Sequence, residues 1–569
     1  MHGIWSKKLA LKILFIGIGI GLLLNHYFTR INHSKYKVLN SQPKKLIVKD
    51  KNLDLPTHGL YLGPDFPKRD AVKSAFKHAW FAYERDAWGS DEYHPISQSG
   101  SNLSNSAGIG YTIIDSLDTI QLMGLTDEYA RARNWIENEL SFDVDDKFNT
   151  FETTIRVLGG LLSSYYLSSN PFSQNPSNPD PLYLNLAADL GERLVSSFDQ
   201  DSGLPLSFVN LHRMEGISDQ DNRGFISTAE AASLQLEFKY LSQLLDDSLF
   251  WRKSEGVMQL IKDAPKRDGL VPIFIDLHNN SPHVKNFYFS SIRLGSRADS
   301  YYEYLLKQYL QTASTEHVYK DMYDTARRGI KRHLLKMTQG PKKMVHTIEL
   351  TPKRGIERRD SCLSLFCHVL TTFSDLNTGH TTSKTIWCVC FLPGLFLLGV
   401  HEGKSHLPLD QSTFTTQQRE DWWVGEELLK TCHQKYDTYT STKSGLSPEI
   451  IHFHQVGDYR GQKEDWYIKP SRGEDTIDGR YILRPETVES IFIAFRLSGN
   501  NKYREWGWSI FESIEKHAKI NSGGYASIMN VNKVPVDHED KMETFLLSET
   551  FKYLYLLFED NSVAPLDMQ

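Results

Sequence analysis

Two carboxylates stand three residues apart at the start of an apolar stretch, Tyr481–Leu497 (YILRPETVESIFIAFRL). This spacing places Glu486 and Glu489 on one face of the first turn of a helix, and Pro485 suits the first helical position. The residues that follow are too apolar for a surface helix. The stretch therefore predicts a buried helix with two carboxylates at its mouth. A plainer interpretation is that acids favour helix N-termini because the helix dipole stabilises them there.

The same arrangement, an acidic cluster before an apolar helix, recurs along the chain. The other clusters contain Asp115 and Asp118, Glu152, Glu230, Asp299, and Glu543. Between them lie amphipathic helices, and clear β-alternation is scarce. Buried helices that alternate with half-exposed ones indicate helical hairpins stacked into a ring. Closing the ring would bring six acidic clusters into one pocket, where we expect shifted pKa values or a bound cation.

The residue types in this pocket favour one kind of chemistry. The sequence shows no Ser-His-Asp or Cys-His pattern for nucleophilic catalysis. Hydrolysis of a glycosidic bond needs one carboxylic acid to protonate the leaving oxygen and one carboxylate to activate water or to attack. Additional carboxylates suit sugar hydroxyls or a hard cation such as Ca²⁺. The residues alone predict an all-α protein with an acid-lined pocket, with glycosidase as the candidate activity.

Composition limits the class of protein. The chain has 569 residues, 40% of them hydrophobic, which is ample for a large core. Its net charge of −6 gives no reason to expect a nucleic-acid partner. The five cysteines lie between Cys362 and Cys432 and lack the spacing of a zinc site.

The N-terminal part differs from the rest. The apolar run Ile13–Leu24, with its extension, is just short of the ~20 residues that span a bilayer, and no small-residue cleavage site follows it. We expect a cytoplasmic tail at 1–8, an uncleaved signal-anchor helix at 9–28, a polar stem at 29–68 and a lumenal body at 69–560. Three glycosylation sequons suit a lumenal body: Asn32-His-Ser, Asn102-Leu-Ser and Asn279-Asn-Ser.

Four longer motifs of the chain are more specific. They begin at Phe151 (FETTIRVLGGLL), Leu294 (LGSRADSYYEYLLKQ), Leu483 (LRPETVES) and Ser548 (SETFKYLYLLF). Together they resemble the class I α-1,2-mannosidases, glycoside hydrolase family 47. The likeness runs from about Arg69 to Phe558 apart from one interval. It implies an (α/α)7 barrel, an inverting mechanism, one bound Ca²⁺, and removal of terminal α-1,2-linked mannose from Man9GlcNAc2 N-glycans.

The resemblance implies catalytic roles for four residues. Glu152 matches the family's acid, which acts through a water, and Glu486 matches the base. Asp299 matches a third catalytic carboxylate. Glu449, in Ser447-Pro-Glu-Ile, matches a fourth that is sometimes assigned as proton donor. In an inverting site the acid and the base stand roughly 6.5–9.5 Å apart, with room for a water.

The resemblance also implies binding roles. Positions that hold substrate or the waters of the cation match Asp118, Glu230, Glu489 and Glu543. Arg297 resembles the arginine of endoplasmic-reticulum members, which limits trimming to one mannose. Glu237 and Glu303 are expected to be packing or hydrogen-bonding residues.

One interval departs from the family pattern. The family carries Asp-His-Leu-Val-Cys-Phe where this chain has Ile386-Trp-Cys-Val-Cys-Phe391, so the Asp-His pair is missing. Cys390 is retained, and the resemblance makes Cys432 its disulfide partner, a bridge worth roughly 3–4 kcal/mol. Residues 354–388 match nothing expected. Codons for Asp-His-Leu-Val, read one base later, encode Thr-Ile-Trp as found at 385–387, so translation in a shifted frame is one hypothesis and ordinary divergence is the other.

The C-terminus also departs. The chain ends before the family's Thr-Glu-Ala-His segment, whose threonine binds Ca²⁺ directly, so 561–569 is interpreted as a truncated tail. No direct metal ligand is assigned, and Ca²⁺ is expected to bind through waters to Glu489 and Glu543.

The combined expectation is a single-pass type II membrane mannosidase of the endoplasmic reticulum or early Golgi. One alternative is a catalytically impaired mannose-glycan receptor on the same fold, acting in ER-associated degradation. Another is a non-enzymatic helical scaffold. Retention of Glu152, Asp299, Glu449 and Glu486 argues against the receptor, and a scaffold has no need of acids at so many buried helix starts.

Overall fold

The structure is a computed structural model of the chain. It describes residues 63–172, 177–199, 201–276, 290–351, 380–382, 384–402, 407–436, 442–454, 464–469 and 477–566. The chain divides into Met1–Thr57 and His58–Gln569, and every described residue belongs to the second unit. The expected tail, anchor and most of the stem lie outside the described residues, as does most of 354–388. Within the described ranges, no helix is long and apolar enough to cross a membrane.

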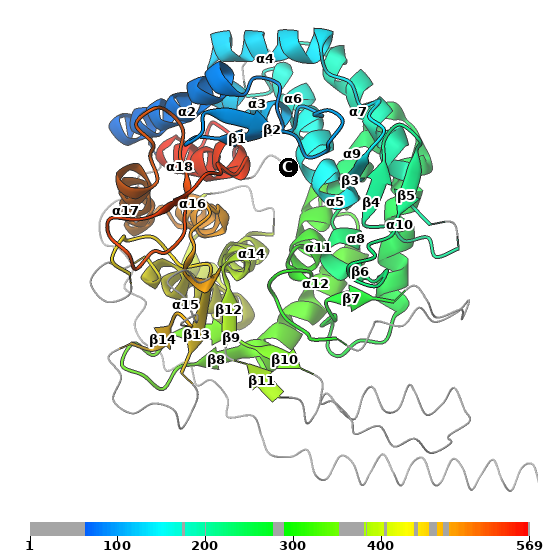
Figure 1. Cartoon of the computed structure of the whole chain (residues 1–569). Helices are drawn as coiled ribbons and strands as arrows, with labels where there is room; N and C mark the ends of the chain where they lie inside the picture. The colour runs from blue at the N-terminus through cyan, green and yellow to red at the C-terminus, as the bar shows by residue number, and fades with distance from the viewer. Residues whose placement is uncertain are drawn as a thin grey trace, which may run out of the picture. The chain divides into compact units, whose positions relative to one another are not determined.

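Seven helices of the described residues form an inner ring in which each packs against the next (Figure 1). They are α3 (Tyr111–Leu122), α6 (Gly159–Ser168), α9 (Gln235–Leu245), α11 (Asp299–Gln311), α14 (Leu392–His401), α16 (Glu486–Ser498) and α18 (Phe551–Phe558). Short π-helical segments, η1 (Thr153–Leu158) and η7 (Leu546–Thr550), lead into α6 and α18 and pack on α3. The expectation of a helical ring is confirmed.

Each inner helix has an outer partner. The outer helices are α2 (Phe66–Asp86), α4 (Thr126–Asn138), α7 (Pro181–Val195), α10 (Ser248–Asp263), α12 (His317–Gly329), α15 (Thr416–Gln434) and α17 (Lys502–His517). Each of the first six inner helices, α3 to α16, packs on the outer helix that follows it in the chain. The last inner helix, α18, packs on the first outer helix, α2. The first and last of these helices therefore close the ring.

The strands are short, as the scarcity of β-alternation predicted, and pair antiparallel in small sheets. The two-stranded sheets are β1 (Glu92–His94) with β2 (Ser99–Ser101), β6 (Ile226–Ser227) with β7 (Phe274–Ile275), β8 (Leu335–Met337) with β9 (Val345–Thr347), β10 (Glu349–Thr351) with β11 (His380–Thr382), and β15 (Ser527–Ile528) with β16 (His538–Glu539). The three-stranded sheets are β3 (Lys147–Asn149), β4 (Phe208–Asn210) and β5 (Glu215–Ile217), and β12 (Lys384–Ile386), β13 (Ile450–Phe453) and β14 (Trp466–Tyr467). All lie in connections from an outer helix to the next inner one, so they gather at the end where the inner helices begin.

Helix α16 is the buried helix that the sequence predicts. Ile491, Ala494 and Phe495 are fully buried, and the helix stops at Gly499, whose φ of +65° is a left-handed conformation that glycine adopts freely. Pro485 was expected at the first helical position, but it is the N-cap, and the helix begins at Glu486. A shift of one residue changes no side chain's face.

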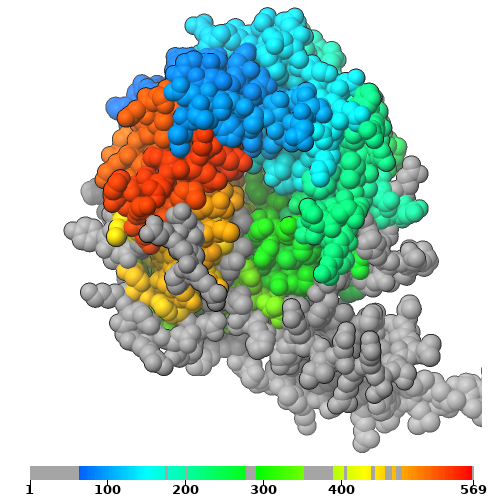
Figure 2. All heavy atoms as spheres, viewed as in Figure 1, coloured from blue at the N-terminus to red at the C-terminus, as the bar shows by residue number. Residues whose placement is uncertain are grey.

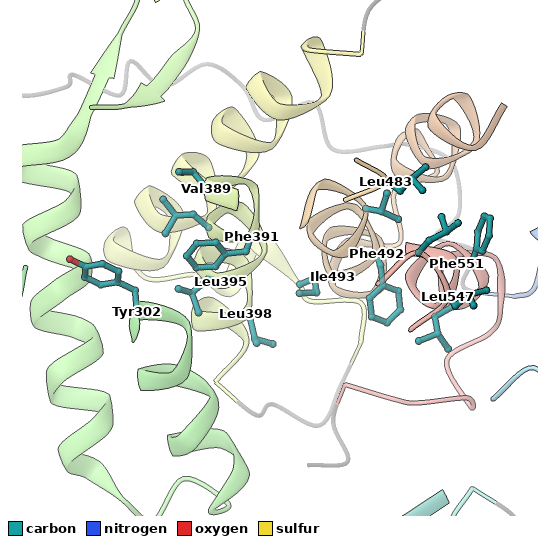
Figure 3. Packing of buried hydrophobic residues seen from close by; sticks show 14 of the residues in the cluster. Tyr302, Val389, Phe391, Leu395, Leu398, Leu483, Phe492, Ile493, Leu547 and Phe551 are labelled. Carbon is teal, nitrogen blue, oxygen red and sulfur yellow. The ribbon is translucent and has the colours of Figure 1, made fainter. Parts of the chain in front are cut away.

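Close packing joins α14 to α16. The Gly394 N–H donates to Ser490 Oγ at 2.9 Å, and Ser490 Oγ donates to the Cys390 carbonyl at 2.6 Å. A Cβ at Gly394 would lie 3.2 Å from the Ser490 Cα, so glycine permits this approach. Figure 3 shows hydrophobic side chains of α14, such as Leu395 and Leu398, among those of the neighbouring helices.

The expected disulfide between Cys390 and Cys432 is present. It joins the 3-10 turn η4 (Trp387–Phe391), which precedes inner helix α14, to outer helix α15. The bridge therefore fastens the two helical layers together.

Candidate functional site

The inner helices enclose a cavity of about 450 Å³, and nearly half of the residues in its wall are charged. The space-filling view in Figure 2 shows the molecule hollowed between the cyan-to-green and the orange-to-red segments. Eight wall residues are acidic: Asp115, Asp118, Glu237, Asp299, Glu303, Glu486, Glu489 and Glu549. Four are basic: Arg156, Lys307, Arg484 and Lys552. Acids from three of the predicted clusters, those of Asp115, Asp299 and Glu486, thus share one cavity, and acids outnumber the cations in its wall.

The start of α16 is held by a tight turn. Leu483, three residues before Glu486, has a φ of +66°, which is strained for a residue with a side chain. Thr550 Oγ1 donates to the Leu483 carbonyl at 2.7 Å and fixes the turn against η7. Arg484 then lies between two carboxylates, with Nη2 2.7 Å from Glu449 Oε1 and Nη1 3.6 Å from Glu486 Oε1. Glu449 is therefore tied to the cavity through Arg484, although it is not a wall residue.

The two carboxyl groups at the start of α16, those of Glu486 and Glu489, have raised pKa values. Burial raises the pKa of Glu486 to about 7; Arg484 opposes the shift, and Glu449 and Glu549 add to it. Burial also raises the pKa of Glu489, against the attraction of Lys307. A carboxyl group that exchanges its proton near neutral pH is suited to acid–base catalysis.

Glu152 stands beside the wall. It follows β3 in a short helical turn, α5 (Thr150–Glu152), where its backbone N–H donates to Asn149 Oδ1 at 2.7 Å. Its carboxylate accepts from Arg156 Nε at 3.1 Å and from the Tyr111 hydroxyl at 3.3 Å. With 43% of the side chain exposed, this carboxylate has access to water.

Glu230 and Arg297 lie near Glu152 but are not wall residues. Like Glu152, Glu230 lies in a helical turn that directly follows a strand. Ser227 caps this turn, and its Oγ accepts from the Glu230 N–H at 3.3 Å. Burial raises the pKa of Glu230, with Arg297 opposing the shift and Glu152 adding to it. The Arg297 guanidinium lies 4.9 Å from the Phe274 ring centre, and its φ of +77° turns the chain into α11, which begins at Asp299.

Two predicted binding residues differ in their position relative to the cavity wall. Asp118 lies in the wall, where Lys552 Nζ approaches its Oδ2 at 2.7 Å. Glu543 is outside the wall, with its Oε2 3.7 Å from Lys541 Nζ, and burial raises its pKa. Of the nine predicted site residues, the wall thus contains Asp118, Asp299, Glu486 and Glu489.

The cations of the wall were not predicted. Arg156 pairs with Glu549, Nη1 to Oε1 at 2.9 Å, and its guanidinium lies 5.5 Å from the Phe545 ring centre, with that of Arg484 at 5.9 Å. Lys307 pairs with both Glu303 and Glu489. The available signal was spacing, since Arg156 stands four residues after Glu152 and Lys307 four after Glu303.

Glu237 and Glu303 have a wider role than expected. Hydrogen bonding is confirmed for Glu237, whose Oε1 accepts from the Tyr304 hydroxyl at 3.0 Å. Both carboxyl groups also line the cavity, so packing alone does not account for them.

The charged groups of the wall suit a hard cation more than a soft one. Within the described ranges, no group of three or more histidine, cysteine or acidic side chains is arranged to hold a metal directly. The wall offers carboxylate and hydroxyl oxygens, and the buried Glu486 Oε2 accepts no hydrogen bond from another described residue. Such a donor set fits Ca²⁺ held through waters.

Comparisons with known proteins agree on one family. The model of glycosyl hydrolase family 47 matches residues 75–569. A mannosyl-oligosaccharide 1,2-alpha-mannosidase of Arabidopsis thaliana is 40% identical over 537 residues, covering 90% of this chain and 79% of the relative. The endoplasmic reticulum mannosyl-oligosaccharide 1,2-alpha-mannosidase of Saccharomyces cerevisiae is 35% identical over 520 residues, covering 86% and 87%.

A solved structure shows the same architecture. The alpha-1,2-mannosidase from Trichoderma reesei superposes with a TM-score of 0.72 at 26% sequence identity, covering 88% of this chain and 94% of that one. The helical barrel is therefore shared with a glycosidase.

Proposed function

Because the chain belongs to glycosyl hydrolase family 47, we propose that it is an exo-α-1,2-mannosidase that trims terminal mannose from high-mannose N-glycans such as Man9GlcNAc2. The observation that carries this proposal is the carboxylate-rich cavity at the starts of the inner helices, with Glu486 held in its wall. The curated relatives, whose names state this activity, support it.

The cavity residues suggest a division of roles. Glu486, whose pKa is raised to about 7, is the base that takes a proton from the attacking water. Glu152, which is exposed to water and held by Arg156 and Tyr111, is the acid that acts through a water on the leaving oxygen. Asp299 completes the reacting carboxylates, and Glu449 keeps Arg484 beside Glu486. Separate acid and base with a water between them correspond to inversion at the anomeric carbon.

The remaining predicted residues would bind the sugar or the cation. Asp118 and Glu489 in the wall, with Glu230 and Glu543 nearby, hold sugar hydroxyls or waters, and Arg297 limits the depth of trimming. Glu489 and Glu543 would hold Ca²⁺ through waters, and the cation would supply a fixed positive charge for sugar oxygens. An oxygen-only donor set and an excess of acids support this part of the proposal.

The proposed location is the membrane of the endoplasmic reticulum or early Golgi, with the barrel in the lumen. Support comes from relatives named as endoplasmic reticulum enzymes and from the apolar run Ile13–Leu24. The receptor alternative is not favoured, because the relatives are named as enzymes and the cavity keeps its carboxylates.

The test is mannose release from Man9GlcNAc2 by the full chain in detergent, with and without a calcium chelator. We expect release of one mannose, abolished by chelation and restored by added Ca²⁺. A folded protein that binds the glycan without releasing mannose would contradict the enzyme and favour the receptor.

A further inference from the structure

The loop after β2 carries one of the three glycosylation sequons, Asn102-Leu-Ser. Asn102 is exposed, and its neighbour Leu103 is 43% exposed although it is apolar. The loop connects outer helix α2 to inner helix α3, so it belongs to the end of the barrel where the inner helices begin and the cavity carboxylates stand. The sequon is therefore displayed on the same end of the barrel as the site.

The two ends of the Asn102 amide group face different surroundings. Its Oδ1 accepts a hydrogen bond from the Asp91 backbone N–H at 3.2 Å. A Cβ at Gly108 would lie only 2.7 Å from this oxygen, so the oxygen end of the amide is packed against the chain. Within the described residues, Nδ2 has no hydrogen-bond partner. The nitrogen is the atom to which an N-linked sugar is attached.

The surrounding network holds the loop independently of Nδ2. Asp91 is buried, and its carboxylate accepts from the backbone N–H groups of Leu103, Ile109 and Tyr111. Ser104 Oγ donates to the Ala107 carbonyl at 2.8 Å and closes the tip of the loop. An amide that gains a sugar on Nδ2 keeps its oxygen, so the hydrogen bond from Asp91 survives the modification.

We propose that Asn102 carries an N-linked oligosaccharide, which places a glycan on the end of the barrel that holds the cavity. In the transfer, the Asn102 Nδ2 forms a bond to the anomeric carbon of a lipid-linked oligosaccharide. The bond from that carbon to the lipid pyrophosphate breaks, the pyrophosphate leaves with the electron pair, and Nδ2 loses one proton. This inference rests on the lumenal location in the proposed function.

The experiment uses the full chain expressed in eukaryotic cells. Peptide mass spectrometry before and after enzymatic removal of N-glycans should show a glycan on the Asn102 peptide, with aspartate at 102 after removal. Asn102→Gln and Ser104→Ala should each lose this glycan, whereas Ser104→Thr, which keeps a sequon, should retain it. The Ser104 variants leave Asn102 and its bond to Asp91 in place, so loss in one and retention in the other cannot come from loss of that bond.

Protease protection of microsomes separates the two proposals. A protected barrel with an unmodified Asn102 would overturn the glycosylation site and leave the location intact. A barrel that protease digests without detergent would overturn the lumenal location and the modification together. Because Asn102 is not in the cavity wall, mannose release by Ser104→Ala should stay within twofold of the parent chain.

Discussion

Helix α9 carries two buried charged side chains in opposite surroundings: one lines the cavity, and the other is ion-paired on the outer side. Glu237 lines the cavity, where its carboxyl group accepts one hydrogen bond from Tyr304, and burial raises its pKa to about 7. Lys239 is 1% exposed and pairs with Glu255 and with Glu316, the latter at 2.8 Å between Nζ and Oε2. Two residues turn a helix by about 200°, so the side chains leave α9 on opposite sides.

The difference separates charges that build the fold from charges kept for a ligand. Lys239 also lies over two rings, 4.7 Å from the Trp251 centre and 4.2 Å from that of Tyr319, so neighbours on α10 and α12 compensate its burial. The cavity wall keeps eight acids against four cations, and this excess of buried negative charge is costly for stability and useful for binding. Substitutions on the inner face should therefore change activity, and those on the outer side should change stability.

The largest expected effect comes from the inner face. Replacing Glu486 with Gln removes the proposed base, and mannose release should fall by about 10²–10⁴-fold, the usual contribution of acid–base catalysis. The unfolding midpoint should not fall, because a buried acid is removed. The matched control is Glu316→Gln beside Lys239, which should lower stability and keep the rate. Full activity in Glu486→Gln would contradict the division between inner charges that serve activity and outer charges that serve stability.

The disulfide between the two layers should matter for stability. Replacing Cys390 and Cys432 together with Ala should lower the free energy of unfolding by about 4 kcal/mol, because the bridge closes a long loop, with a sequence separation of 42. Denaturant titration measures this change. Dithiothreitol should destabilise the parent chain and leave the double variant unaffected; equal responses would show that the bridge contributes little.

Lys239→Met tests the outer side directly. The substitution keeps a long apolar side chain but leaves Glu255 and Glu316 without their cation, and we expect a loss of about 3 kcal/mol. The exposed Lys262 on α10 provides the control, since Lys262→Met should change stability by less than about 0.5 kcal/mol. Reduced mannose release per folded molecule in Lys239→Met would contradict the division between the two sides.

The smallest effect depends on pH. The pKa of Glu237 is raised from 4.5 to about 7, so the folded state holds its proton more tightly than the unfolded state. The stability of the parent chain should therefore fall as pH rises from 4.5 to 7, by at most about 3 kcal/mol. Glu237→Gln has no charge to bury, so it should be more stable than the parent at pH 8 and equal at pH 4. Parallel stability curves would show that the carboxyl group is not desolvated.

The inner helix starts could be predicted because burial and acidity are both visible in the sequence. The apolar run behind Glu486 and Glu489 is typical of a buried helix, and both residues are in the wall. Motif resemblance supplied the pairing of Cys390 with Cys432, which spacing alone could not give.

The cations could not be predicted for a physical reason. Lys307 four residues after Glu303 looks like a surface ion pair that stabilises a helix. Only the closed ring shows that this pair faces the cavity and that Glu489 on another helix completes it. The place of Glu237 in the cavity wall was not predicted either, because the sequence does not show which face of α9 the ring turns inward.

The most direct test of the account is the configuration of the first mannose released from Man9GlcNAc2, followed by proton NMR with the full chain and with Glu486→Gln. The account predicts that the parent chain releases β-mannose, the inverted product, before mutarotation, and that the variant releases mannose at least about 100-fold more slowly. Release of α-mannose, or no release from a folded parent chain in the presence of Ca²⁺, would contradict it.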